Sequence, residues 1–289
     1  MIRKYFIAGY NICIDYDNDA ELEERLSEYV SSFSKEADIT INISKTNGEI
    51  EIRQDNLIKL SDIAYFYSTP KNDIVFYYDP AISKTVAKIV FEKDYKMADV
   101  YVYELKACHG VEDKMLIFNL VNTIINYAVQ MNNGFVFHSS SVCVDGMGVA
   151  FSAKSGTGKS THTNLWLENF KGSFILNDDT PIISLAKGGV FTISGTPWAG
   201  TTGINKNITV PLKAVVFLER DSKNSIAQLP VQEAIKRFFE GIKTPLTDAM
   251  FSSALGTLNK LLTSVPVYLL KCNMDTEAAI TAYNGIFGK

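Results

Sequence analysis

The segment Ala153–Ser160 has the composition of a phosphate-binding loop. Gly156 and Gly158 allow successive backbone N–H groups to approach phosphate oxygens, because no Cβ atom stands in the way. Lys159 is placed to neutralise the β- and γ-phosphates of a nucleotide, and the hydroxyl of Ser160 can bind Mg²⁺. The segment therefore predicts nucleotide binding. The other residues expected to contact the nucleotide are Ser155, Thr157 and Thr161.

This loop departs at one position from the usual G-x-x-x-x-G-K-[ST] pattern, because Ala153 stands where the first glycine is expected. Its surroundings fit the pattern: residues 148–152 form an apolar run typical of a buried strand, and residues 160–167 are typical of a helix. A helix that begins near Gly158 directs the positive end of its dipole at a bound anion. The alternative interpretation is an ordinary strand–turn–helix unit with a solvated lysine.

A pair of acidic residues, Asp178 and Asp179, follows the next apolar run, residues 174–177. One carboxylate could hold the metal ion of a metal–nucleotide complex, directly or through water. The other could accept a proton from a substrate hydroxyl. The alternative is that the two acids only open the turn before Pro181. With a phosphate-binding loop just upstream, the pair favours phosphoryl-transfer chemistry.

Two further residues are candidates for contact with the substrate. Trp198 lies in a segment rich in glycine and hydroxyl residues, 193–203, which is typical of a mobile lid. Its side chain is expected either to fill the core or to form a wall of the substrate pocket. Arg220 follows the apolar run 212–218 and could reach the transferred phosphoryl group, although a surface ion pair with a neighbouring acid is the favoured interpretation.

The composition, 46% hydrophobic and 21% charged residues, is typical of a water-soluble globular protein. A net charge of −4 argues against nucleic acid or an anionic membrane as a partner. The cysteines are widely spaced and the histidines scattered, so no zinc site is expected and a reducing cytoplasm fits. We see no signal peptide, and the apolar segment 115–131 carries asparagines at helical spacing, so no membrane anchor is expected.

Two regions with different patterns divide the sequence. Residues 1–106 consist largely of short alternating runs, which predict a small, mostly antiparallel, strand-rich α+β domain. Within it, residues 19–33 have apolar residues at helical spacing behind Asp19, which predicts a helix capped by that residue. The turn Thr46-Asn47-Gly48 with alternating residues on both sides, 38–53, predicts a hairpin. Residues 107–289 alternate strand and helix patterns and predict an α/β nucleotide-binding domain, with the boundary near Ala107–Gly110.

Residues 135–219 resemble the catalytic domain of HPr kinase/phosphorylase and, more distantly, ATP-dependent phosphoenolpyruvate carboxykinase. The residues that carry the resemblance are His138, the turn Asp145-Gly146-Met147-Gly148, the loop Ser155–Ser160 and the pair Asp178-Asp179. The resemblance implies an α/β P-loop domain of the phosphoenolpyruvate carboxykinase type that uses ATP and Mg²⁺. No counterpart of the carboxykinases' oxaloacetate-binding arginines is present, so decarboxylation is not expected.

The resemblance also implies roles for individual residues. Asp178 would be the general base that prepares the attacking hydroxyl, Asp179 and Ser160 would serve the metal, and His138 would lie beside the transferred phosphate together with Lys159. Where the HPr kinases have a glutamate-bearing signature, this chain has Gly195-Thr196-Pro197-Trp198-Ala199-Gly200. HPr itself is therefore not expected to be the substrate, and related kinases that modify serine hydroxyls of peptide natural products indicate other acceptors.

The sequence thus predicts an ATP- and Mg²⁺-dependent kinase that phosphorylates a serine-like hydroxyl on a small molecule, a peptide or a protein. The alternative is a nucleotide-responsive binding or regulatory module without transfer activity, which Ala153 and the missing family glutamate would favour. Dephosphorylation by the reverse reaction with phosphate is a subsidiary option. A homo-oligomer is compatible with the sequence, and the acceptor is left open.

Overall fold

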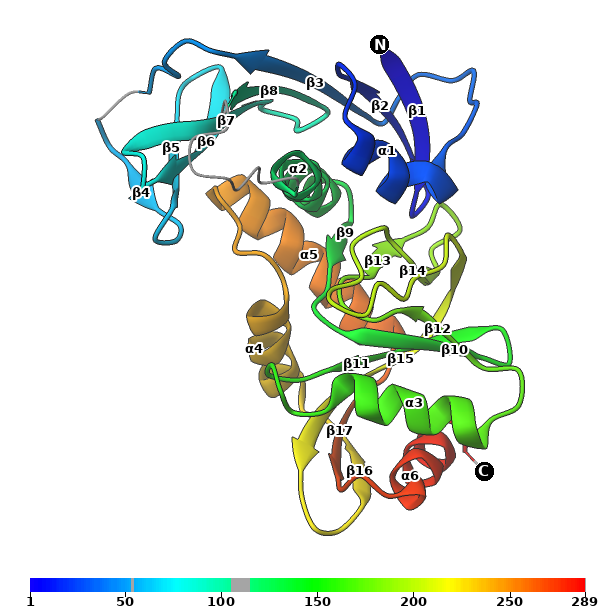
Figure 1. Cartoon of the computed structure of the whole chain (residues 1–289). Coiled ribbons are helices and arrows are strands. Elements are labelled where there is room, and N and C mark those ends of the chain that lie inside the picture. The colour runs from blue at the N-terminus through cyan, green and yellow to red at the C-terminus, as the bar shows by residue number, and fades with distance from the viewer. Residues whose placement is uncertain (53–54, 105–114, 289) are drawn as a thin grey trace. The chain divides into compact units, whose positions relative to one another are not determined.

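The computed structural model describes residues 1–52, 55–104 and 115–288, which divide into two units, Met1–Ala128 and Val129–Lys289 (Figure 1). Both units are mixed α/β structures, and each is built on a multi-stranded sheet. The boundary that the sequence predicted, near Ala107–Gly110, lies outside the described residues. No helix in the described part of the chain is long and apolar enough to cross a membrane.

An eight-stranded sheet forms the N-terminal unit, in the order β1-β2-β3-β8-β7-β6-β5-β4. The strands are β1 (Ile2–Ile7), β2 (Tyr10–Asp15), β3 (Ile39–Thr46), β4 (Ile58–Lys59), β5 (Ala64–Ser68), β6 (Asn72–Asp79), β7 (Lys84–Glu92) and β8 (Met97–Tyr103). Only the pairings of β3 with β2 and with β8 are parallel among the described strands of this sheet, so the prediction of a mostly antiparallel sheet is confirmed. Its helices are α1 (Ala20–Leu26), the 3₁₀ turn η1 (Ser27–Tyr29) and α2 (Leu116–Met131), whose last residues belong to the second unit.

The hairpin predicted around Thr46-Asn47-Gly48 is wrong. Strand β3 ends at Thr46, and residues 47–52 lie in no strand. The reason is that both edges of β3 are occupied, by β2 on one side and by β8 on the other. A turn signal produces a hairpin only when the first strand has a free edge with which the returning chain can pair.

Helix α1 begins where the sequence predicts, because Asp19 caps it: the N–H of Leu22 donates to its Oδ1 at 3.0 Å. The helix is shorter than the predicted span 19–33 and ends at Leu26. Beyond η1 the chain leaves helical geometry because Val30 forms a β-bridge with Tyr5 of β1. Pairing with the sheet thus overrides the helical periodicity.

A nine-stranded sheet forms the C-terminal unit, in the order β12-β10-β11-β15-β14-β13-β9, with β17 also beside β15 and β16 beside β17. The strands are β9 (Gly134–Val136), β10 (Ser140–Val144), β11 (Met147–Ser152), β12 (Phe174–Asn177), β13 (Ile182–Leu185), β14 (Phe191–Ser194), β15 (Thr209–Arg220), β16 (Ser225–Gln228) and β17 (Val267–Cys272). The helices are α3 (Lys159–Asn169), α4 (Val231–Gly241), α5 (Asp248–Ser264) and α6 (Thr276–Phe287). The predicted strands at 148–152, 174–177 and 212–218 are confirmed as β11, β12 and part of β15.

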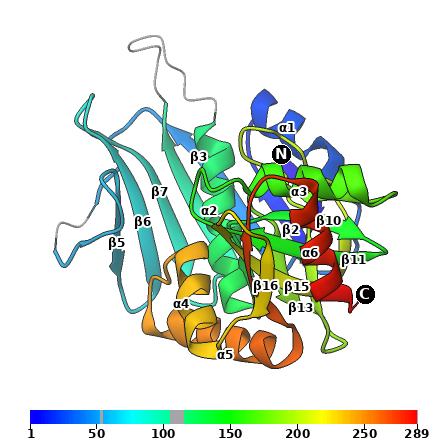
Figure 2. The same ribbon diagram turned by 90° about the horizontal axis from the view of Figure 1, so that it is seen from below.

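This sheet lies between two pairs of helices (Figures 1 and 2). One face packs against α3 and α6, with Trp166 fully buried between them. The other face packs against α4 and α5, where Phe238 is fully buried. Adjacent residues of β15 alternate between the two clusters, Val216 in the first and Phe217 in the second. The strand is therefore hydrophobic on both faces, as its continuous apolar run indicates.

The carboxyl ends of four strands meet at one edge of this sheet. Strand β15 pairs in parallel with β11 and with β17, and β12 shares their direction because β11 and β12 are both antiparallel to β10. Residues that follow these strands therefore converge, as they do at the ligand-binding edges of other α/β sheets. The converging segments are the loop 153–158 after β11, the acidic pair after β12, Arg220 at the end of β15 and Met274 after β17.

A buried histidine on α3 makes the stability of this unit depend on pH. His162 packs against Phe151, with ring centroids 4.7 Å apart, and the Nε1–H of Trp166 donates to its Nε2 at 3.2 Å. Burial lowers the pKa of His162 from 6.5 to about 4. The unfolded chain therefore binds a proton between these pH values that the folded chain does not, so the free energy of unfolding falls as the pH falls through this window.

We expect the wild-type protein to lose about 2 kcal/mol more stability than His162→Gln between pH 7 and pH 5. Urea unfolding followed by tryptophan fluorescence measures this difference, because both tryptophans, Trp166 and Trp198, lie in the C-terminal unit. An identical change in the two proteins would contradict a buried neutral His162.

Candidate functional site

The loop between β11 and α3 has a backbone that suits an anion. Gly156 (φ 76°) and Gly158 (φ 114°) both lie in the left-handed region that favours glycine. The N–H of Thr157 donates to the carbonyl of Lys154 at 3.1 Å and closes a turn. Helix α3 then begins at Lys159 with Gly158 as its N-cap, so the unpaired N–H groups of its first turn face the loop.

Ala153 needs no glycine at its position. Its backbone lies outside the positive-φ region. A residue with a Cβ atom therefore adopts this conformation without strain. Its side chain also packs, partly buried, against the hydrophobic cluster beneath α3. The departure from the usual motif therefore leaves the shape of the loop intact.

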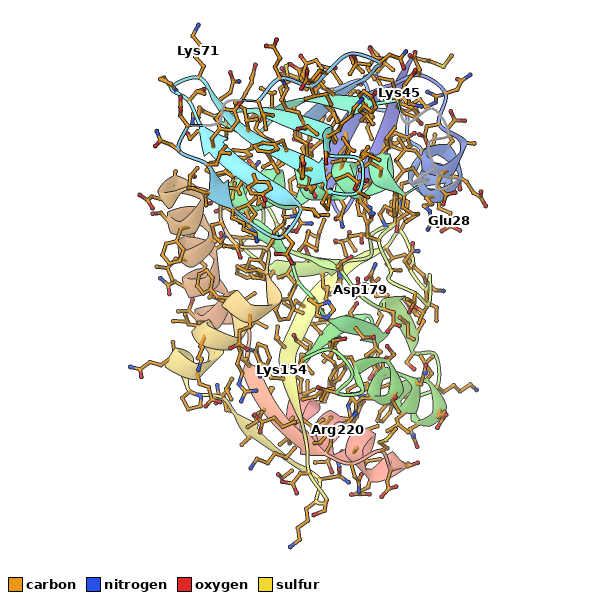
Figure 3. All side chains as sticks on the ribbon, turned by 60° about the vertical axis from the view of Figure 1, so that its left-hand side comes forward. Glu28, Lys45, Lys71, Lys154, Asp179 and Arg220 are labelled. Atoms are coloured by element: carbon orange, nitrogen blue, oxygen red, sulfur yellow. The ribbon has the colours of Figure 1, made fainter. Side chains whose placement is uncertain are left out.

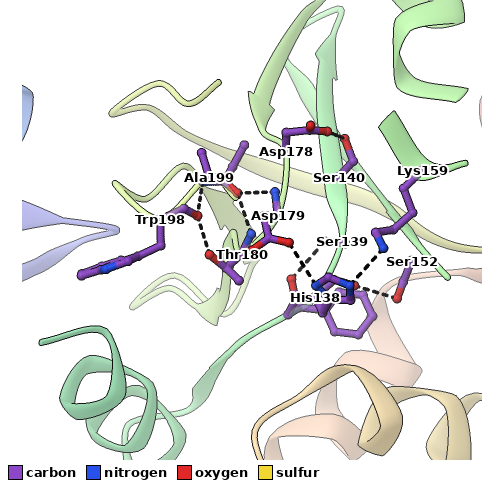
Figure 4. A network of polar contacts seen from close by, with 12 residues as sticks. His138, Ser139, Ser140, Ser152, Lys159, Asp178, Asp179, Thr180, Trp198 and Ala199 are labelled. Atoms are coloured by element: carbon purple, nitrogen blue, oxygen red, sulfur yellow. Dashed lines mark hydrogen bonds and ion pairs between the residues drawn. The ribbon is translucent and has the colours of Figure 1, made fainter. Parts of the chain in front are cut away.

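Lys159 points back across the loop. Its Nζ donates to the carbonyl of Ala153 at 3.2 Å and lies 3.0 Å from Nε2 of His138 (Figure 4). Partial burial lowers the pKa of Lys159, and the negative charges of Asp179 and Asp178 act in the opposite direction. The ammonium group is thus held beside the loop and next to the acidic pair.

His138 links Lys159 to Asp179. Its Nδ1 lies 3.2 Å from Oδ1 of Asp179, while its Nε2 faces the Lys159 ammonium. A neutral ring that accepts from Lys159 at Nε2 carries its proton on Nδ1, from which it donates to Asp179. The backbone is fixed as well: the His138 N–H donates to the carbonyl of Gly241 at 2.8 Å, and Ser152 Oγ donates to the His138 carbonyl at 2.9 Å.

Asp178, the first residue of the acidic pair, is buried, with 6% of its surface exposed. Its Oδ1 accepts a hydrogen bond from Ser140 Oγ at 2.6 Å. Ser140 lies in β10 and is itself 3.0 Å from the hydroxyl of Thr163 in α3. These contacts fix the orientation of the carboxylate. A residue that only opened a turn would not need such contacts.

Asn177 joins the acidic pair to the loop that contains Trp198. It is fully buried, and its Oδ1 accepts from the N–H groups of Asp179 at 2.9 Å and Thr180 at 2.7 Å. Its Nδ2 donates to the carbonyls of Thr196 at 2.9 Å and Trp198 at 3.3 Å. Asn177 was not among the residues predicted from the sequence, although an asparagine that ends a strand before a turn is a recognisable signal for such bonding.

The segment after Trp198 is held at both ends. The side chain of Trp198 is buried, with 5% exposed, and its carbonyl is bound by Asn177. At the far end, the N–H of Asp178 donates to the carbonyl of Ile204 at 3.2 Å, and the N–H of Lys206 donates to the β12 backbone at 2.9 Å. Residues 199–203 therefore project from two points fixed on β12 and the acidic turn.

Arg220 secures the outer side of the glycine-rich loop. Its Nε donates to the carbonyl of Thr157 at 3.0 Å, and its Nη2 donates to the carbonyl of Gly156. The surface ion pair that the sequence favoured is not found among the described residues. Strands β11 and β15 are parallel neighbours, so their carboxyl ends meet and Arg220 at the end of β15 contacts the loop after β11. Figure 3 labels this arginine together with Lys154 and Asp179.

Arg220→Met should loosen this loop without unfolding the protein. The carbonyls of Gly156 and Thr157 lose their donors, so we expect backbone amides in residues 154–158 to exchange hydrogen about tenfold faster. The free energy of unfolding should change by less than about 1 kcal/mol, because the contacts are exposed. Hydrogen-exchange mass spectrometry measures the first effect. Lys223→Met, an exposed substitution just beyond β15, is the control, and equal exchange in the two variants would contradict the role of Arg220.

Two open cavities are lined by both the loop and His138. One, of about 390 Å³, we call the acid-pair cavity. It is lined by His138, residues 155–161, Asp178, Asp179, residues 199–202, Arg220 and Met274. The other, of about 750 Å³, we call the α4 cavity, and its wall includes Arg237, Glu219 and Glu240. The acid-pair cavity thus brings together the predicted residues of the loop, the acidic pair, His138 and Arg220, whereas Trp198 itself does not line it.

The fold and the site define a mixed α/β protein in which a glycine-rich loop, a lysine, a histidine and an acidic pair meet at one edge of a sheet. The chain belongs to the family of the SynChlorMet cassette protein ScmC, whose model matches residues 102–277, more than half of its length. The matched family is therefore not the HPr kinase family that the motifs resemble.

Comparisons with individual proteins are more distant. No curated protein matches the chain. Among solved structures, that of the Hpr(Ser) kinase/phosphatase from Coxiella burnetii is similar, with 13% sequence identity and a TM-score of 0.32. The match covers 53% of this chain and 97% of that one. A likeness at this level does not extend to activity.

Proposed function

We propose that this chain is an ATP- and Mg²⁺-dependent phosphotransferase that phosphorylates a serine-like hydroxyl. The observation that carries the proposal is the acid-pair cavity, which is lined by a glycine-rich loop, a lysine and a buried carboxylate that Ser140 holds by a hydrogen bond. Phosphoryl transfer needs these groups together: donors and a cation for the phosphates, and an acceptor for the hydroxyl proton.

The loop residues fit the phosphates of a nucleotide. No atom lies within 4 Å of the Cβ position at Gly156, so phosphate oxygens have room to approach the backbone N–H groups. The first turn of α3 adds further N–H groups and the positive end of the helix dipole. Ser155, Thr157 and Thr161, which line the same cavity, complete the set of residues that we assign to the nucleotide.

The hard oxygen donors of Ser160 and Asp179 fit Mg²⁺, which prefers one or two carboxylates together with substrate phosphates. The described residues contain no group of three or more histidine, cysteine or acidic side chains that could hold a metal. The remaining ligands of the proposed Mg²⁺ would come from the nucleotide phosphates and water. When bound there, Mg²⁺ would neutralise charge on the phosphates.

Asp178 would act as the general base. The acceptor hydroxyl gives its proton to the Asp178 carboxylate while its oxygen bonds to the γ-phosphorus; the bond from that phosphorus to the β–γ bridging oxygen breaks, and ADP leaves. Ser140 keeps the carboxylate oriented toward the cavity, and His138 keeps Lys159 beside the phosphates. Residues 199–202, which line the cavity next to the acids, would contact the acceptor.

The test is transfer to a panel of hydroxyl acceptors. The full-length protein is incubated with ATP, Mg²⁺ and free serine, serine-containing peptides, small alcohols or the proteins of a cell extract, and products are identified by mass spectrometry. We expect a phosphorylated acceptor, formed only with Mg²⁺ and absent with Lys159→Met. ATP binding with slow hydrolysis and no phosphorylated acceptor would favour the regulatory module instead, an alternative to which the unstrained backbone at Ala153 gives no support.

A further inference from the structure

A third cavity, of about 280 Å³, lies against α3, and we call it the α3 cavity. Its walls come from the start of α3 and from the ends of β15 and β17. The acidic pair follows β12, which is separated from β15 in the sheet by β10 and β11. In the order of the sheet, the acids therefore lie on the β10 side of β11, and the α3 cavity lies on its β15 side.

The α3 cavity is continuous with the acid-pair cavity. The residues that line both are Thr157, Gly158, Thr161, Arg220 and Met274. An elongated ligand can therefore occupy the two at once. If its terminal phosphate faces the acids and Lys159, the rest of it can run across the first turn of α3, toward the ends of β15 and β17.

The chemistry of the α3 cavity suits an uncharged aromatic group. Leu165, Leu218 and Cys272 supply apolar walls. His162 also lines it, and burial lowers its pKa to about 4, so the ring is neutral. Because Trp166 donates to Nε2, the proton of His162 is on Nδ1, a buried atom without a partner in the described part of the chain.

We infer that the α3 cavity binds the nucleobase of the nucleotide whose phosphates occupy the glycine-rich loop. This inference rests on the proposed function. A nucleobase offers an uncharged aromatic face that can pack against the apolar walls. Glu219 and Arg220 line both the α3 cavity and the α4 cavity. The α4 cavity is a poorer match, because Lys154, Arg237 and Glu240 add further charge to it, and it opens beside His138, at the reacting end of the loop.

Filling the α3 cavity should separate base binding from phosphate binding. Leu165 is partly exposed and lines the cavity, so Leu165→Trp would occupy the space of the base without adding charge. Leu167 lies on the same helix, is 40% exposed and does not line the cavity, so Leu167→Trp is the matched control. Titration calorimetry of both variants and the wild type with ATP and with inorganic tripolyphosphate, each with Mg²⁺, gives the comparison.

We expect wild-type protein to bind ATP at least about tenfold more tightly than tripolyphosphate, because the base is buried in addition to the phosphates. Leu165→Trp should abolish this difference by weakening ATP alone, and Leu167→Trp should preserve it. Equal affinities in the wild type, or an unchanged ATP affinity in Leu165→Trp, would overturn the base site and leave the proposed function intact. Failure of the wild type to bind either ligand would instead refute the proposed function, and the base site with it.

Discussion

Asp178→Asn should reduce the rate of phosphoryl transfer by about 10³-fold, within the usual range for the loss of a general base. The amide keeps the shape of the side chain and can still accept the hydrogen bond from Ser140, so the fold should be preserved. It cannot take a proton from the acceptor hydroxyl. The Kd of ATP should change little, because the loop and Lys159 remain. Steady-state kinetics and titration calorimetry measure the two quantities.

Asp248→Asn provides the control for this experiment, because it removes one carboxylate from an exposed position at the start of α5. Its kcat should match that of the wild type. If Asp178→Asn also turned over at the wild-type rate, Asp178 would not be the base. A loss of ATP affinity equal to the loss of rate would show that Asp178 acts in binding instead.

The second large effect is expected at Asn177, this time on stability as well as activity. In Asn177→Leu the partly buried backbone N–H groups of Asp179 and Thr180 and the buried carbonyl of Thr196 lose their partner. Each unsatisfied group costs about 1–3 kcal/mol, so we expect a total loss of roughly 3 kcal/mol or more. Transfer should fall too, because the acidic turn is no longer aligned with the Trp198 loop.

Urea unfolding followed by tryptophan fluorescence measures this loss in the C-terminal unit. Asn164→Leu, an exposed substitution on α3, makes the same chemical change outside the network and should alter stability by less than about 0.5 kcal/mol. Similar unfolding midpoints for the two variants would show that Asn177 does not hold the two loops together.

The parts of the structure that the sequence predicted correctly depend on local rules. The Asp19 cap, the strand before the glycine-rich loop and the strand before the acidic pair all follow from the chemistry of neighbouring residues. The hairpin at Thr46–Gly48 failed because the competing partner, β8, begins far along the chain at Met97. Edge occupancy is a property of the whole sheet and is not visible in a short window of sequence.

The candidate site shows the same division. Lys159 and the acidic pair could be proposed from motifs, because their chemistry is recognisable from residue type and spacing. Ser140 could not, because its contact with Asp178 joins residues 38 positions apart and depends on the pairing of β10 with β12. Arg220 was assigned to a surface ion pair, since only the parallel pairing of β11 with β15 reveals that it contacts the loop carbonyls.

The way in which residues 199–203 are attached has a consequence for how proteins of this family can diversify. Trp198 at one end and Ile204 at the other are bound to Asn177 and Asp178, and between them Ala199 is buried and Gly200 lies against the side chain of Asp179. The exposed residues 201–203 can therefore change in length or type without displacing the acids. Selection for a new acceptor can then act on this short exposed segment alone. Recognition and chemistry are inherited separately, which makes the segment a natural position for loop grafting between relatives.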